Sequence, residues 1–269
     1  MGRRLLNPIF GMLAKKLYLL PAGPLSGFPF NGLRIDGKFL AETHEVVNLM
    51  SLSSLAEKRP VLRQNYADRV FLAGNPQTDR ELFSYDVQVS PEISSVTDHF
   101  VGPGLHIVQG VALNKGEFRD DRFSAAGLIH LAIPGVIDLA FPDRSSLLMS
   151  QTGNNPLIEN LFPPDIRGIE FNADLVVLSQ TSAIGVSRSD FDSRIGFVSD
   201  FLDGGVKNVV VSFQFSEEPD SIAFLREFYD RLEATAHIAE ALSLTRNNWL
   251  KPGDEANFRM WAGFQLFIR

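Results

Sequence analysis

Thr181 and Ser182 are the residues whose types and position first raise the question of chemistry. They follow Gln180 directly after the apolar run 175–178. A hydroxyl becomes a useful nucleophile when a positioned base takes its proton, because its pKa lies far above that of a thiol. The nearest histidine in sequence is His130, and imidazole is the side chain best suited to exchange a proton near neutral pH. These residues therefore decide whether hydrolytic chemistry is feasible.

The remaining polar residues predict no metal or cofactor site. The sequence contains no cysteine, which excludes disulfides, thiolate metal ligands and a cysteine nucleophile. None of the other histidines has a partner at the spacing of a zinc site; these histidines are His44, His99, His106 and His237. Some acidic residues could pair for acid–base catalysis, but loop or helix-capping roles explain them better. These residues are Asp120, Asp121, Asp165, Glu217 and Glu218.

Composition narrows the classes of protein to which the chain can belong. The 269 residues are 45% hydrophobic and include 22 phenylalanines, which is enough to build a large aromatic core. The formal net charge of -7 argues against a nucleic-acid-binding surface. No run of eighteen apolar residues predicts a membrane span, and the first residues make a poor signal peptide. We therefore expect a soluble cytoplasmic protein with no nucleic-acid or membrane partner.

The elements that must position these residues are strands alternating with helices. The run 174–179 is typical of a strand buried on both faces of a parallel sheet. The other predicted strands are 17–20, 46–50, 69–73, 105–108, 128–133, 147–149, 209–213 and 261–268. Helical spacing of apolar residues predicts helices at 3–16, 51–58, 91–100, 189–203, 219–233 and 236–246. This alternation predicts an α/β fold with three layers, in which helices flank a central, mainly parallel sheet.

Several segments of the sequence occur in an order that is typical of one known family. The first is Leu17-Tyr-Leu-Leu-Pro-Ala-Gly-Pro-Leu-Ser-Gly-Phe-Pro-Phe30. The later segments include Leu128-Ile-His-Leu-Ala-Ile-Pro-Gly135, Ala173-Asp-Leu-Val-Val-Leu-Ser179, Phe201-Leu-Asp-Gly-Gly-Val206, Val209-Val-Val-Ser-Phe-Gln214, Phe228-Tyr-Asp-Arg-Leu232 and Trp261-Ala-Gly-Phe264. In this order and spacing they resemble the CHAT domain family, whose members have a caspase-like fold and belong with the caspase and separase type of cysteine peptidase. The resemblance implies a degenerate amino-terminal α/β subdomain at 1–110 and a caspase-like subdomain at 111–269.

The family's chemistry uses a histidine and a cysteine at the ends of two neighbouring strands. This sequence has neither residue at the matching positions. The resemblance places the histidine position on Pro134, next to the retained Gly135. It places the cysteine position on Thr181, or on Ser182 if the alignment gap is moved by one residue. Proline accepts no proton, so the usual base is missing. We expect His130 to be a packed structural histidine.

The resemblance and these replacements together favour a catalytically inactive pseudopeptidase that acts as a regulatory or protein-interaction module. We expect a groove at the carboxyl ends of the strands, between the loops 134–146, 180–190 and 214–219, lined by His130, Gly135, Gln180 and Gln214. The expected partner is a protein, either a helical-repeat sensor module, which the family often carries, or an active homologue. Two alternatives remain open. One is a residual hydrolase that uses Thr181 or Ser182, and the other is a groove that binds a peptide or ligand without cutting it.

Overall fold

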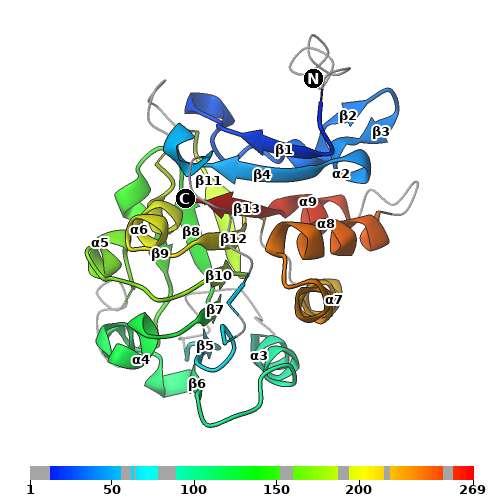
Figure 1. The fold of residues 1–269 in the computed structure, drawn as a ribbon. Coiled ribbons are helices and arrows are strands. Elements are labelled where there is room, and N and C mark those ends of the chain that lie inside the picture. Colours follow the sequence, from blue (N-terminus) through cyan, green and yellow to red (C-terminus); the bar gives the residue numbers. More distant parts are fainter. Residues whose placement is uncertain are drawn as a thin grey trace.

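The computed structural model describes residues 13–55, 62–63, 65–77, 89–151, 160–186, 194–214, 219–250 and 257–269. An eight-stranded sheet runs through the whole of this structure (Figure 1). From one edge to the other its strands are β1 (Lys16–Leu19), β4 (Glu45–Leu49), β13 (Phe264–Ile268), β12 (Asn208–Ser212), β10 (Leu175–Leu178), β7 (Leu128–Ala132), β5 (Val70–Gly74) and β6 (Leu105–Gln109).

The sheet consists of two parallel blocks that meet at one antiparallel pair. β6, β5, β7, β10 and β12 run in one direction, whereas β13 pairs antiparallel with β12 and parallel with β4. The amino-terminal strands β4 and β1 therefore extend the sheet beyond its last carboxyl-terminal strand. A buried hydrogen bond from Asn48 Nδ2 to Gln265 Oε1 (3.2 Å) links β4 to β13 across this join.

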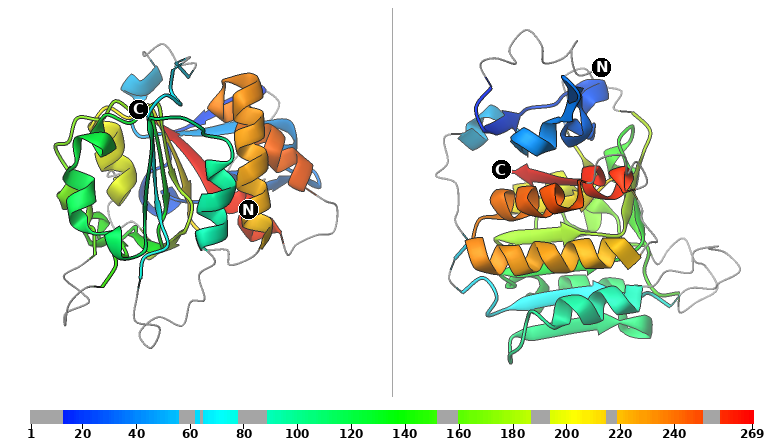
Figure 2. Two further views of the ribbon diagram at one scale, coloured as in Figure 1. Left: turned by 90° about the horizontal axis from the view of Figure 1, so that it is seen from below. Right: turned by 90° about the vertical axis from the view of Figure 1, so that its right-hand side faces the viewer.

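Helices cover both faces of the sheet, so the predicted three-layer α/β fold is confirmed (Figure 2). One face carries α3 (Val89–Thr97), α7 (Pro219–Thr235), α8 (Ile238–Trp249) and α9 (Phe258–Gly263). The other face carries α4 (Asp121–Ser124), α5 (Pro163–Ile166) and α6 (Gly196–Asp203). A short helix, α2 (Leu40–Thr43), follows the β2–β3 hairpin (Arg34–Ile35 and Lys38–Phe39).

The predicted burial of the 174–179 run on both faces is confirmed by the packing of β10. Val176 and Leu178 pack in the core beneath α4, α5 and α6, while Leu175 and Val177 pack in the core beneath α3, α7 and α8. All four side chains are fully buried. The side chains of consecutive strand residues point to opposite faces, so an uninterrupted apolar run fits a strand with helices on both sides.

A smaller three-stranded sheet lies at the carboxyl ends of the central strands. It contains β11 (Thr181–Ile184), β8 (Gly135–Asp138) and β9 (Ser146–Leu147), in that order. A strand near 147 agrees with the sequence analysis, but β8 and β11 were not predicted. Both are only four residues long, and neither shows a continuous apolar run. Their pairing with each other, rather than their composition, makes them strands.

The predicted start of the last strand, at residue 261, is wrong. Residues 261–263 belong to helix α9, and strand β13 begins at Phe264. The buried Arg246 guanidinium donates to the carbonyl oxygens of Trp261 and Phe264, and these bonds satisfy carbonyl groups where the helix ends.

Where the structure describes it, the predicted start of the helix at 189–203 is also wrong. Residues 194 and 195 are not helical, and α6 begins at Gly196. Positions 187–193 lie outside the described residues. A Cβ atom on Gly196 would lie 2.4 Å from Ser145 Oγ, so a larger residue does not fit at this first helical position. Of the helix predicted at 51–58, the described residues form a 3-10 turn at Leu52–Leu55. The helix predicted at 3–16 falls largely outside the described residues, and Lys16 already lies in β1.

Candidate functional site

The structure brings the segments that follow β7 and β10, where the sequence predicts the family's histidine and cysteine positions, side by side. β7 and β10 are neighbouring parallel strands with Leu131 opposite Leu178, so the segments that follow them leave the sheet side by side. The backbone N–H of Gly135 donates to the carbonyl oxygen of Gln180 (3.0 Å). Thr181 is the pairing partner of Gly135 in the small sheet. Pro134 thus lies directly before β8, and Thr181 is the first residue of the neighbouring strand β11, at the carboxyl edge where open α/β sheets place their ligands.

Gly135 is required by the close approach of β9. A Cβ atom at this position would lie 2.5 Å from Leu147 Cδ2 and 2.6 Å from the carbonyl oxygen of Ser146. The second contact is with backbone, which cannot move aside as a flexible side chain can. The neighbouring Pro134 carbonyl accepts a hydrogen bond from the N–H of Leu148 (2.8 Å). Pro134, the predicted histidine position, is therefore hydrogen-bonded to the residue that follows β9.

The Thr181 hydroxyl is committed to a structural hydrogen bond. Its Oγ1 is buried and donates to the carbonyl oxygen of Ser212, at the end of β12, over 2.5 Å. The backbone N–H of Ala183 donates to the carbonyl oxygen of Phe213 (2.9 Å) in the same connection. An amide carbonyl does not remove a proton from a hydroxyl, so this arrangement ties β11 to β12 and does not activate Thr181.

Ser182 is partly exposed and lies opposite Val136 in the small sheet. The contacts of the imidazoles lie elsewhere. His99 is 3.7 Å from Asp230, and His106 is 3.5 Å from Glu117. None of the hydrogen bonds described for a histidine reaches the Ser182 hydroxyl. Ser182 thus has solvent access but no described partner that could act as a base.

His130 lies in a buried polar cluster inside the core. Its Nε2 is 2.9 Å from Glu92 Oε1, and its Nδ1 is 2.8 Å from the hydroxyl of Tyr229. Gln180 Nε2 donates to the second carboxylate oxygen of Glu92. His130 and Glu92 are fully buried, and Gln180 and Tyr229 are nearly so. The cluster therefore joins β7, α3, α7 and the first residues after β10 inside the core.

The donor of each bond follows from the group that keeps its proton. Burial raises the pKa of the Tyr229 hydroxyl well above its usual value of 10.0, and the nearby Glu92 adds to the shift. The hydroxyl therefore keeps its proton and can donate it to Nδ1 of His130. Nε2–H of the imidazole then donates to Glu92, whose carboxylate also accepts from Gln180. Every polar group in the cluster has a partner, as buried polar groups require.

The other residues predicted to line a groove occupy different surroundings. Gln180 is buried with its amide directed at Glu92, and Gly135 is partly exposed. Gln214 follows β12 and lies close to Gly263, because a Cβ atom added to Gly263 would lie 3.2 Å from the Cβ of Gln214. The structure brings Gly135, Gln180 and Thr181 together through the small sheet. Of the loops predicted to line the groove, residues 187–190 and 215–218 lie outside the described residues.

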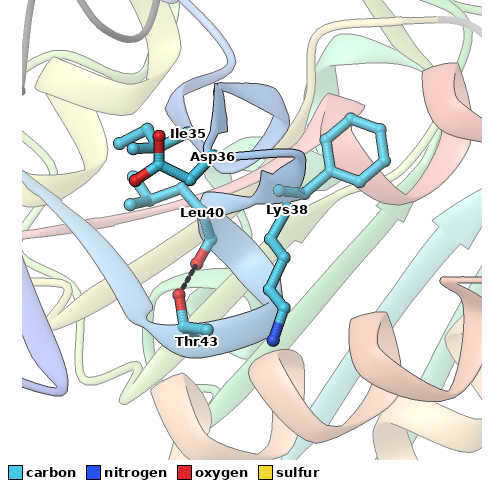
Figure 3. A pocket seen from close by; sticks show the side chains of 6 residues that line it. Ile35, Asp36, Lys38, Leu40 and Thr43 are labelled. Carbon is cyan, nitrogen blue, oxygen red and sulfur yellow. Dashed lines mark hydrogen bonds between the residues drawn. The ribbon is translucent and has the colours of Figure 1, made fainter.

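A hollow of about 190 Å³ lies in the amino-terminal part of the structure (Figure 3). It is formed by the β2–β3 hairpin and α2, and it is lined by Ile35, Asp36, Lys38, Phe39, Leu40 and Thr43. Its walls combine apolar side chains with a lysine and an aspartate from the hairpin. No residue of the His130 cluster and neither degenerate position contributes to it.

A comparison with protein-family models shows which family this architecture represents. The model of the CHAT domain matches residues 2–268, which is nearly the whole sequence. The chain belongs to the CHAT domain family. The resemblance inferred from the sequence is thereby confirmed, and the CHAT domain is a caspase-like module related to cysteine peptidases. No curated protein matches the chain significantly.

In this CHAT domain the described residues hold no cluster of three or more histidine, aspartate or glutamate side chains that could bind a metal ion. Within the same residues, no helix is both long and apolar enough to cross a membrane.

Sequence reasoning missed Glu92 and Tyr229 as the partners of His130. The available signal for Glu92 was its place beside the apolar Ile93 in a predicted helix. The signal for Tyr229 was its place in the apolar stripe of the helix at 219–233.

Proposed function

We propose that this CHAT domain is a catalytically inactive member of its family and that it acts as a protein-interaction or regulatory module. The observation that carries the proposal is the hydrogen bond from the Thr181 hydroxyl to the Ser212 carbonyl. This bond gives the hydroxyl at the predicted cysteine position a structural role. The proline at the histidine position and the absence of cysteine from the sequence support the same conclusion.

The surroundings of His130 also support an inactive site. A general base must reach the group whose proton it removes, and both ring nitrogens of His130 already face Glu92 and Tyr229 inside the core. Moving the imidazole toward Thr181 would leave the buried Glu92 carboxylate without one of its donors. The cost of an unpaired buried charge is several kcal/mol, roughly 3–5. The cluster is thus better suited to stabilise the sheet than to move protons.

The interaction role is supported by exposed apolar side chains on the small sheet. Ile184 and Val186 lie at the end of β11, and Phe141 lies beyond β8, and all three are exposed. Gly185 lies close to Ala140, because a Cβ atom added to Gly185 would lie 3.2 Å from Ala140 Cβ. The segments that follow β8 and β11 are therefore neighbours. We propose that this surface, made of Phe141, Ile184 and Val186, binds the protein partner, a helical-repeat sensor module or an active homologue. Exposed apolar clusters of this kind mark interaction sites.

The inactive assignment is tested with a fluorophosphonate probe, which labels activated serine and threonine hydroxyls. We expect no label on the native protein and no hydrolysis of a peptide library. Label that disappears in Thr181→Ala or Ser182→Ala would establish the residual hydrolase instead. Peptide binding without cleavage, lost on substitution at Gln214, would favour the non-catalytic groove.

The interaction surface is tested by placing a photo-reactive amino acid at position 184 in cells. Position 52 is the matched control, because Leu52 is 67% exposed but belongs to a different part of the fold. We expect cross-links to one protein from position 184 and none from position 52. Equal cross-linking from the two positions would count against this surface.

A further inference from the structure

The two edges of the eight-stranded sheet differ in chemistry. β1 forms one edge, and its first residue, Lys16, pairs with Glu45 (3.1 Å) on the neighbouring strand. Pro21 follows two residues after the strand. β6 forms the other edge, and its sequence Leu105-His-Ile-Val-Gln109 contains no lysine, arginine, acidic residue or proline (Figure 1). Natural proteins protect open edges with lysine and proline, and β6 lacks this protection.

The backbone of β6 offers free hydrogen-bonding groups along this edge. The Gly104 carbonyl accepts from Val70 N–H of β5 (3.0 Å), so it points inward. Alternate residues of a strand direct their N–H and C=O groups to the same side, and those of Leu105, Ile107 and Gln109 therefore point outward. The Leu105 N–H donates to the Gly102 carbonyl in a turn (3.2 Å). Within the described residues, the N–H and C=O of Ile107 and the N–H of Gln109 remain available. Gln109 is the N-cap residue of the 3-10 helix η5 (Gly110–Ala112), and its carbonyl accepts the first hydrogen bond of that helix.

Exposed apolar side chains accompany these groups. Ile107 is 39% exposed in the strand itself. Val101, before the strand, is 95% exposed, and Val111, after it, is 62% exposed. The edge of β6 therefore combines unused backbone donors and acceptors with apolar side chains at its centre and at both ends. This combination is typical of a strand that accepts another strand.

The charges beside the edge are already paired within the chain. Arg122 donates to Asp120 (2.8 Å), and the His106 ring lies 3.5 Å from Glu117. His106 of β6 and its neighbour Arg122 therefore have acidic partners on the same chain, although the whole chain carries a net charge of -7. Self-association of two identical edges needs this local neutrality, because like charges would meet across the two-fold axis.

We propose that β6 pairs antiparallel with β6 of a second copy about a two-fold axis, so that the sheets of two CHAT domains join. Ile107 of each copy lies opposite Gln109 of the other, and these two residues supply the backbone hydrogen bonds. This register leaves the turn from Leu105 to Gly102 intact. An isologous two-fold contact is also the commonest symmetry of protein oligomers. The proposal does not depend on whether the domain is catalytic.

The association is tested by sedimentation velocity over a range of concentrations. We expect a reversible dimer for the unmodified protein. Ile107→Lys should raise the dissociation constant at least tenfold by adding the missing edge charge, and Gln109→Pro should do the same by removing an outward N–H. Leu52→Lys is the matched control, since it adds the same charge at an exposed apolar residue outside the edge. Thermal unfolding shows whether each variant is folded.

Cross-linking provides a second measurement that does not disturb the strand. The sequence has no cysteine, so Gln109→Cys creates a unique thiol. The proposed register places the two Cα atoms of residue 109 about 9 Å apart, within reach of a short bis-maleimide. We expect rapid cross-linking of Gln109→Cys and none of Leu52→Cys. A monomer at all concentrations, or a dimer unaffected by both edge variants and not cross-linked at 109, would overturn the proposal.

Discussion

His130 and Glu92 lie 38 residues apart in the sequence, yet His130 Nε2 is 2.9 Å from Glu92 Oε1 inside the core. Both side chains have no exposed surface. The contact joins β7 to helix α3 on the sheet's face. Through Glu92 it also reaches Gln180, the residue before Thr181. The cluster therefore links β7 and the segment after β10 to the same helix.

The first prediction concerns the role of Glu92 in stability. Glu92→Ala removes the acceptor of two buried donors, on His130 and Gln180. We expect the free energy of unfolding to fall by about 3–5 kcal/mol, because those groups lose their partner and the truncation leaves a cavity. Urea denaturation measures the change. Glu240→Ala, at an exposed position of α8, should change it by less than about 0.5 kcal/mol.

Thr181→Val tests whether the hydroxyl at the cysteine position is structural. Valine keeps the shape of threonine but leaves the buried Ser212 carbonyl without its donor. We expect a loss of about 1–3 kcal/mol in denaturant unfolding. Ser182→Ala serves as the comparison, because its partly exposed hydroxyl can be replaced by water. A Thr181→Val variant as stable as the unmodified protein would contradict the structural role.

A third prediction concerns acid sensitivity through Asp174, which precedes β10. Burial of this carboxyl opposes its ionisation, but hydrogen bonds from Lys207 and Arg63 outweigh burial and lower its pKa below the usual 3.8. A carboxyl with a lowered pKa stabilises the folded state above its unfolded pKa, and this contribution disappears as the pH falls through the folded value.

Asp174→Asn should therefore be less stable than the unmodified protein by about 3 kcal/mol at pH 7. The difference should shrink steadily below a pH of about 4, where the unfolded chain takes up the proton first. Urea denaturation at pH 7, 4 and 3 measures it. Asp143→Asn is the control, since its side chain is 57% exposed. A difference that stays constant with pH would show that Asp174 acts through packing alone.

The fourth prediction concerns Arg246, which joins α8 to the junction of α9 and β13. Its buried guanidinium donates to two carbonyl oxygens, those of Trp261 and Phe264. Arg246→Lys keeps the charge, but a single ammonium group does not reproduce the planar fork that reaches both acceptors. We expect a loss of about 1–3 kcal/mol in thermal or urea unfolding. Arg226→Lys on α7 is the matched control outside this junction, and it should be nearly neutral.

The sequence by itself determined the parallel α/β fold, because long apolar runs such as 175–178 require burial on both faces. It also predicts, from residue order alone, that Pro134 and either Thr181 or Ser182 stand where the family has its histidine and cysteine. Tertiary structure decided what surrounds them. The bond of Thr181 to Ser212, the pairing of β8 with β11, and the link from His130 to Tyr229, 99 residues away, all depend on distant segments. Local periodicity reports which side of an element is buried, and it carries no information about which distant group meets it there.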